Sequence, residues 1–120
     1  MGINTVAVIG AGTMGAGIAQ VCAQAGWHTN LYDAFPEGLE RGMNTIDAFW
    51  DKGIARGKTT AEQKATWAAN LHAVSDMHAA VKDADLVIEA VPEIPDLKHK
   101  IFADLGKMTK QDCILGTNTS

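Results

Sequence analysis

The sequence predicts an α/β fold in which helices cover both faces of a single parallel β-sheet. Short apolar runs alternate along the chain with longer segments of helical periodicity, as in repeated βαβ units. The first apolar run leads directly into a glycine-rich turn and then into a helix. The length of 120 residues corresponds to one domain, residues 1–120, with no visible linker or repeat.

The first strand is predicted over residues 5–9, because a continuous apolar run is typical of a central parallel strand covered on both faces. A helix is predicted over residues 13–25, and Gly26 suits the position just after a helix end. Helical spacing predicts that the inner face of this helix carries Ile18, Val21, Cys22 and Ala25.

A second strand is predicted over residues 27–32, followed by an inserted helical hairpin. The first hairpin helix begins near Phe35-Pro36-Glu37, and Gly53 to Gly57 should break it. Its buried stripe, at helical spacing, consists of Leu39, Met43, Ile46 and Trp50. Thr60 and Gln63 form a capping-box pattern for a second helix that runs to about Ala69.

The remaining elements continue the alternation. They are a strand over 71–74, a short helix over 76–81, a strand over 86–91, a helix over 95–108 and a strand over 113–116. Together these elements predict a Rossmann-type doubly wound parallel sheet with a helical hairpin inserted after the second strand.

The pattern Gly10-x-Gly12-x-x-Gly15 lies between the first strand and the first helix, where a dinucleotide pyrophosphate is bound in such folds. Gly10 allows the tight turn, Gly12 lets backbone approach the phosphates, and Gly15 lets the helix pack closely on the strand. The helix start at Thr13 and Met14 then offers free N–H groups to the anion.

Asp33 ends the second strand, 23 residues after Gly10, which is about where an acidic side chain reaches the adenosine ribose. A carboxylate accepts hydrogen bonds from ribose hydroxyls and repels a 2′-phosphate, and no arginine follows at Ala34 or Phe35. This pattern favours NAD over NADP as the cofactor. The alternative is a strand-end aspartate that only shapes a turn.

Other polar residues permit two interpretations each. Glu89 and Glu93 flank the end of the fourth strand, where either can face the cofactor or serve as a structural carboxylate. Asn118 and Ser120 follow the fifth strand on the same side of the sheet. Lys52, Arg56 and Lys58 at the hairpin tip form either a phosphate-binding patch or an ordinary solvated surface.

Composition excludes several classes of function. The net charge is −4, and the longest basic run is Lys98-His99-Lys100, so nothing indicates a nucleic-acid surface. The four histidines and two cysteines form no catalytic or metal-binding pattern. No membrane span or signal peptide is evident, and the unpatterned cysteines, Cys22 and Cys113, suit a reducing cytoplasmic compartment.

The chain resembles the N-terminal, NAD-binding domain of the L-3-hydroxyacyl-CoA dehydrogenases, including 3-hydroxybutyryl-CoA dehydrogenases. The resemblance covers essentially the whole chain. It rests on Val6–Gly26 (VAVIGAGTMGAGIAQVCAQAG), Leu31–Asp33 (LYD), Ala84–Glu93 (ADLVIEAVPE), Ile114–Ser120 (ILGTNTS) and the hairpin piece KGIARGKTTAEQK.

The resemblance implies the NAD-dependent interconversion of 3-hydroxyacyl-CoA and 3-ketoacyl-CoA, as in fatty-acid β-oxidation. It implies that Asp33 binds the adenosine ribose, and that Ala90, Val91, Glu93, Lys98 and Asn118 lie along the cofactor. Ser120 matches the serine that hydrogen-bonds the 3-oxygen of the substrate. Lys52 and Arg56 match the region that binds the phosphates of coenzyme A.

In that family the general base is a histidine in a His-Phe-Phe-Asn-Pro-like segment, paired with a glutamate, beyond the position of Ser120. The helical domain that forms the homodimer also lies there. We therefore expect residues 1–120 to bind NAD without turnover. Two alternatives stay open: a dehydrogenase of a free hydroxy acid or sugar acid, similar to gulonate dehydrogenase and lambda-crystallin, and a non-catalytic nucleotide-binding module.

Overall fold

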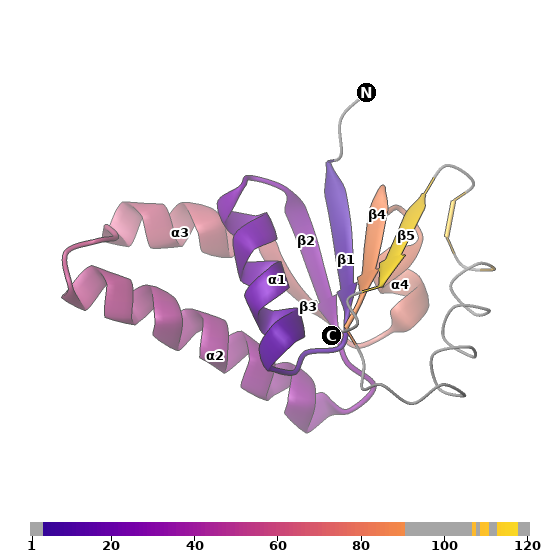
Figure 1. Ribbon diagram of the computed structural model, residues 1–120, viewed down its shortest axis with the longest axis horizontal. Helices are drawn as coiled ribbons and strands as arrows, with labels where there is room; N and C mark the ends of the chain where they lie inside the picture. The colour runs from indigo at the N-terminus through magenta and orange to yellow at the C-terminus, as the bar shows by residue number, and fades with distance from the viewer. Residues whose placement is uncertain (1–3, 91–106, 108, 111–112, 118–120) are drawn as a thin grey trace.

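The computed structural model describes residues 4–90, 107, 109–110 and 113–117. Its elements are β1 (Thr5–Ile9), α1 (Thr13–Gln24), β2 (His28–Tyr32), α2 (Pro36–Ala55), α3 (Ala61–Ala69), β3 (Leu71–Val74), α4 (Met77–Val81), β4 (Leu86–Glu89) and β5 (Ile114–Thr117). The strands form one parallel sheet in the order β3-β2-β1-β4-β5 (Figure 1). The predicted doubly wound sheet with an inserted hairpin is therefore confirmed.

Strand β1 lies at the centre of the sheet because its side chains are apolar on both faces. Val6 and Val8 pack toward α1 and α2, whereas Ala7 and Ile9 pack toward α4. This alternation follows from the two-residue period of a strand. The two faces therefore have separate hydrophobic clusters, and residues Val6–Ile9 of β1 are buried between them.

Helix α1 buries a face of small residues, and the inner face predicted from sequence is wrong in two positions. The buried residues are Gly15, Ala16, Ala19, Cys22 and Ala23. Val21 is 63% exposed and Ala25 is exposed, although Cys22 is buried as predicted. Small side chains let the helix axis approach the sheet closely, so close packing and not side-chain size sets the orientation of α1.

Helix α2 buries its predicted stripe, with Leu39, Ile46 and Trp50 inside and Met43 packed against them. The helix ends at Ala55, inside the predicted break from Gly53 to Gly57, and Gly57 follows with a φ of +73°. A Cβ on Gly53 would lie 2.7 Å from the hydroxyl oxygen of Thr59, so the Thr59 side chain packs closely on Gly53 as the turn folds back.

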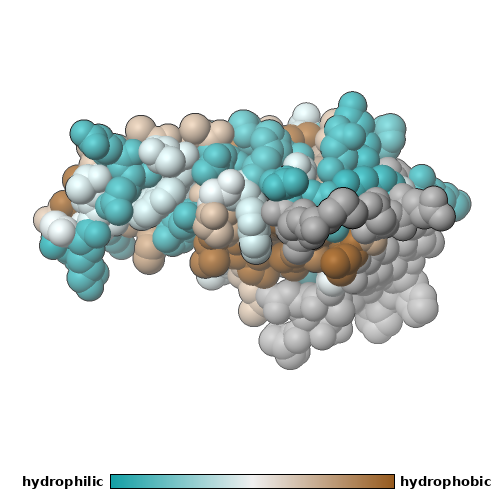
Figure 2. Space-filling model, turned by 90° about the horizontal axis from the view of Figure 1, so that it is seen from above, coloured by the Kyte–Doolittle hydropathy of each residue, from teal (hydrophilic) through white to brown (hydrophobic). Residues whose placement is uncertain are grey.

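The hairpin of α2 and α3 extends beyond the sheet (Figure 1). Helix α3 begins with the predicted capping box, in which the Thr60 hydroxyl accepts from the Gln63 N–H at 3.1 Å and the Gln63 side chain accepts from the Thr60 N–H at 3.0 Å. Lys64 joins the two helices through Asp47 and Asp51, which raise its pKa. Hydrophilic residues cover most of the face seen in Figure 2, and hydrophobic residues gather along one side.

Several predicted boundaries shift by one or two residues. α1 ends at Gln24, β2 begins at His28, α4 begins at Met77 with Asp76 as its N-cap, β4 ends at Glu89, and β5 runs over Ile114–Thr117. The predicted helix over 95–108 lies outside the described residues, apart from Lys107, which is helical. In the part of the chain that the structure describes, no helix is long and apolar enough to cross a bilayer.

Candidate functional site

The strand register brings three loops together at one edge of the sheet. Ile9 is level with Tyr32 in β2 and with Glu89 in β4, so the residues that follow these strands are neighbours. The Gly10 N–H donates to the Tyr32 carbonyl at 2.7 Å, and the Ala90 N–H donates to the Ile9 carbonyl at 2.8 Å. In open α/β sheets, ligands bind outside this carboxyl edge.

The glycine turn has the geometry that its sequence predicts. Gly10 has a φ of +109°, which favours glycine. A Cβ on Gly15 would lie 1.7 Å from the Gly10 carbonyl oxygen and 3.5 Å from the Cβ of Ala90, so only glycine allows α1 to start this close to the sheet. A Cβ on Gly12 would meet nothing within 4 Å, so the space beside Gly12 is open.

The start of α1 is suited to an anion. Gly12 is the N-cap and provides no side-chain cap, and the first turn holds no acidic residue. Among the described residues, none accepts a hydrogen bond from the N–H groups of Thr13, Met14 or Gly15. The positive end of the helix dipole lies beside the open space at Gly12, which fits the diphosphate of a dinucleotide.

Asp33 lies across the turn from α1 and holds the turn in place. Its Oδ2 accepts from the Ala11 N–H at 2.8 Å, and its Oδ1 accepts from the Phe35 N–H at 2.9 Å. A carboxylate offers about four lone-pair sites, so two remain for ribose hydroxyls. The turn-forming role and the ribose-binding role, which the sequence set against each other, are therefore compatible.

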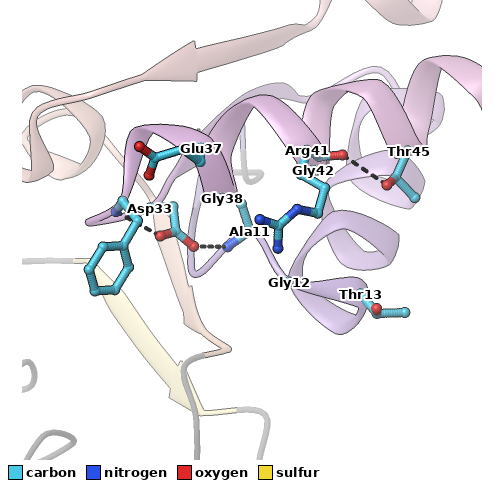
Figure 3. Close-up of a pocket in the computed structure, with 10 residues that line it drawn as sticks. Ala11, Gly12, Thr13, Asp33, Glu37, Gly38, Arg41, Gly42 and Thr45 are labelled. Carbon is cyan, nitrogen blue, oxygen red and sulfur yellow. Dashed lines mark hydrogen bonds between the residues drawn. The ribbon is translucent and has the colours of Figure 1, made fainter.

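A cavity of about 420 Å³ opens between the glycine turn and the first half of α2 (Figure 3). Ala11, Gly12 and Thr13 form one wall, and Asp33 and Phe35 lie at its end. The other wall belongs to α2 and includes Glu37, Gly38, Arg41, Gly42 and Thr45. The predicted site residues at the turn and at the end of β2 thus share one cavity.

Two glycines bring α2 close to this turn. A Cβ on Gly42 would lie 2.6 Å from the carbonyl oxygen of Ala11, and a Cβ on Gly38 would lie 3.1 Å from Asp33 Oδ1. Gly38 and Gly42 are one helical turn apart and therefore share a face. Glycines four residues apart in a helix are the sequence signal of such a close approach.

Arg41 and Glu37 also line this cavity, although the sequence did not indicate them. No arginine follows Asp33 directly at Ala34 or Phe35, but α2 carries Arg41 back over the turn (Figure 3). No described residue forms an ion pair with the Arg41 guanidinium. The missed signal is the position of Arg41 directly before Gly42, on the edge of the face that contacts the turn.

The other predicted site residues divide into two groups. Lys52 and Arg56 are exposed near the far end of α2, away from the cavity (Figure 1). Eleven residues of helix separate Arg41 from Lys52, which corresponds to roughly 16 Å along the axis. Five predicted residues lie outside the described part of the chain: Val91, Glu93, Lys98, Asn118 and Ser120.

Four other titratable side chains near the sheet are partly or fully buried. Glu89 is fully buried at the end of β4. Burial, Asp33 and Asp76 raise the pKa of Tyr32, and burial raises the pKa of the Cys22 thiol. His72 stacks on His28 at 4.3 Å between ring centroids, and burial and His28 lower its pKa. The described residues contain no group of three or more metal-ligating side chains.

Comparison with known proteins places this site in a family. Residues 5–120 match the family model "3-hydroxyacyl-CoA dehydrogenase, NAD binding domain". The chain is 45% identical over 118 residues to the 3-hydroxyadipyl-CoA dehydrogenase of Escherichia coli K12, covering 98% of this chain and 25% of that protein. It is 40% identical over 113 residues to a probable 3-hydroxybutyryl-CoA dehydrogenase of Deinococcus radiodurans, covering 94% of this chain and 40% of that protein.

A solved structure shows the same fold. The (S)-3-hydroxybutyryl-CoA dehydrogenase of Ralstonia eutropha superposes with a TM-score of 0.94 at 35% identity, covering 99% of this chain and 42% of that chain. The chain therefore spans less than half the length of these relatives.

Proposed function

Since the chain belongs to the 3-hydroxyacyl-CoA dehydrogenase family, as its NAD-binding domain, we propose that it holds NAD for the interconversion of a 3-hydroxyacyl-CoA and a 3-ketoacyl-CoA. One observation carries this proposal: the uncapped start of α1 faces a cavity whose opposite end is the carboxylate of Asp33. A dinucleotide requires this combination, because it presents a diphosphate and a ribose diol a short distance apart.

In the proposed complex, the diphosphate lies over Gly10, Gly12 and Gly15. The N–H groups at Thr13 and Met14 donate to its oxygens. Asp33 accepts hydrogen bonds from the adenosine ribose with the lone pairs that Ala11 and Phe35 leave free. The Phe35 ring, which is 70% exposed, offers an apolar surface to the adenine. Ala90 packs against Gly15 at the base of the site.

In this proposal, loops later in the chain bind the nicotinamide half of the cofactor, which is the half that reacts. Bound NAD supplies a hydride acceptor at its nicotinamide ring. We assign Val91, Glu93, Lys98 and Asn118 to this half and Ser120 to the 3-oxygen of the substrate, from their sequence match to the family. Transfer of the hydride from the 3-carbon of the substrate also requires a positioned base that takes the proton of the 3-hydroxyl, for which the family uses a histidine.

The proposed substrate is an acyl thioester of coenzyme A. Lys52 and Arg56 are exposed cations at the end of α2, and they suit the phosphates of coenzyme A. We further propose a homodimer, formed through the helical domain that the family carries after this one. A cytoplasmic location suits Cys22 and Cys113, which form no CxxC or zinc-binding spacing in the sequence.

Isothermal titration of the chain with NADH and NADPH tests the cofactor proposal. NADH should bind, and NADPH should bind at least tenfold more weakly, because Asp33 repels a 2′-phosphate. The absence of NADH binding would contradict the proposal. Equal affinities would contradict the role of Asp33 at the ribose.

Binding of acetoacetyl-CoA tests the substrate proposal separately. The double variant Lys52→Glu/Arg56→Glu should raise its Kd several-fold, since two attractive charges become repulsive. Lys82→Glu, at an exposed cation just after α4, is the matched control and should leave the Kd unchanged. An unchanged Kd in the double variant would favour a free hydroxy acid as the substrate.

A further inference from the structure

The cavity beside Asp33 contains a cation that the binding of NAD does not require. Arg41 extends from α2 toward the glycine turn (Figure 3). Its guanidinium has no ion-pair partner among the described residues. Arginine presents donors in a planar fork that matches a phosphate group, so an unpaired arginine in a cavity wall is a candidate phosphate ligand.

The packing of α2 fixes where this cation lies. Gly38 touches Asp33 and Gly42 touches Ala11, so both ends of the Asp33–Ala11 hydrogen bond lie against the same helix face. Arg41 precedes Gly42 in sequence, and its side chain extends toward Ala11 and Gly12 in the cavity that Asp33 also lines (Figure 3). A ribose held by Asp33 would present its 2′ position to this region of the cavity.

The negative charge of Asp33 counteracts the attraction of Arg41 for a phosphate group in this region. Two backbone N–H groups hold the carboxylate, so it cannot turn away from an approaching phosphate without losing both hydrogen bonds. Glu37, one turn before Arg41, adds a second carboxylate to the same cavity. Because the cavity holds one cation and two carboxylates, it favours the binding of a neutral ribose diol over that of a phosphate dianion.

We propose that Arg41 is a specificity-determining residue that forms a latent site for the 2′-phosphate of NADP, and that the clamped carboxylate of Asp33 keeps this site closed. Arg41 then sets the residual affinity for NADPH, whereas Asp33 sets the preference for NADH. This inference rests on the proposed function, because it requires the adenosine ribose to lie at Asp33.

Titration calorimetry on the whole chain tests the proposal with Arg41→Gln and a control, Lys82→Gln, which removes an exposed charge outside the cavity. Arg41→Gln should raise the Kd of NADPH at least fivefold and leave the Kd of NADH within twofold. Lys82→Gln should change neither. The proposal is overturned if the ratio of the NADPH Kd to the NADH Kd in Arg41→Gln equals the wild-type ratio. This holds whether both affinities fall or neither does.

A second pair of variants keeps the test decisive if wild-type affinity for NADPH is below detection. Asp33→Asn removes the negative charge and retains one side-chain oxygen as an acceptor. It should raise the affinity for 2′,5′-ADP at least tenfold relative to ADP, and Asp33→Asn/Arg41→Gln should abolish that gain. A gain that persists in the double variant overturns the role of Arg41. Failure of the wild type to bind NADH would instead contradict the proposed function.

Discussion

The backbone N–H of Ala11 donates a hydrogen bond of 2.8 Å to the carboxylate of Asp33, across 22 residues of sequence. The other oxygen of the same carboxylate accepts from the Phe35 N–H at 2.9 Å. One side chain therefore joins the glycine turn after β1 to the start of α2. The candidate cofactor ligand is also the clamp that shapes the cavity, so binding and local stability are coupled at Asp33.

Asp33→Ala should weaken both folding and cofactor binding. The substitution leaves two backbone donors without their acceptor, which costs about 1–3 kcal/mol of unfolding free energy. NADH affinity should fall more than tenfold, because the ribose contact and the shape of the turn are lost together. Urea denaturation and calorimetric titration measure the two effects. Unchanged stability with lost binding would show that the clamp contributes nothing to folding.

Gly15→Ala and Gly17→Ala should have opposite effects, although both glycines lie in α1. A Cβ on Gly15 would overlap the Gly10 carbonyl, so the backbone must move, at a cost of about 1–3 kcal/mol or more. A Cβ on Gly17 meets nothing within 4 Å, so alanine there should stabilise the helix by about 0.5–1 kcal/mol. Urea denaturation of both variants checks the difference. Equal effects would mean that close packing at Gly15 is unimportant.

The sheet could be predicted because its signals are local. A strand such as β1 is an uninterrupted apolar run, and the capping box at Thr60 and Gln63 is visible within four residues. The orientation of α1 could not be read in the same way. Hydrophobic periodicity favours large apolar residues such as Val21, whereas the sheet here requires the smallest residues at the contact.

The candidate site was predictable where chain order implies position. Residues just after parallel strands meet at one edge, so Gly10 and Asp33 were expected close to the end of the fourth strand. Arg41 reaches the same cavity only because α2 folds back over the turn. That contact depends on the crossing of two elements, for which a sequence gives only the indirect sign of Gly38 and Gly42.

Thr60→Ala should destabilise α3 by removing one half of its capping box. The loss of a threonine N-cap typically costs about 1 kcal/mol. Thr66→Ala is the matched control, since the Thr66 hydroxyl donates to the Glu62 carbonyl within the helix and caps no end. The control should change the unfolding free energy by less than about 0.5 kcal/mol. A thermal-unfolding series on both variants measures the contrast, and equal losses would rule out a specific capping effect.

Asp85 should make the fold sensitive to acid. Its carboxylate pairs with Lys110 and accepts from the N–H groups of Asn4 and Thr5, at 2.9 Å and 3.0 Å. These contacts lower the pKa of Asp85 from 3.8 to about 2. Because the folded pKa lies below the unfolded value, the stabilisation is fully present above about pH 4 and is lost as the pH falls toward 2.

Asp85→Asn tests this dependence, since it removes the charge while leaving an oxygen that can accept a hydrogen bond. The variant should be less stable than the wild type at about pH 5, and the difference should narrow steadily as the pH falls toward about 2. Urea midpoints at a series of pH values measure it, with Asp83→Asn as the control at an exposed neighbouring carboxylate. A difference that stays constant with pH would show that Asp85 acts through its shape and not through its charge.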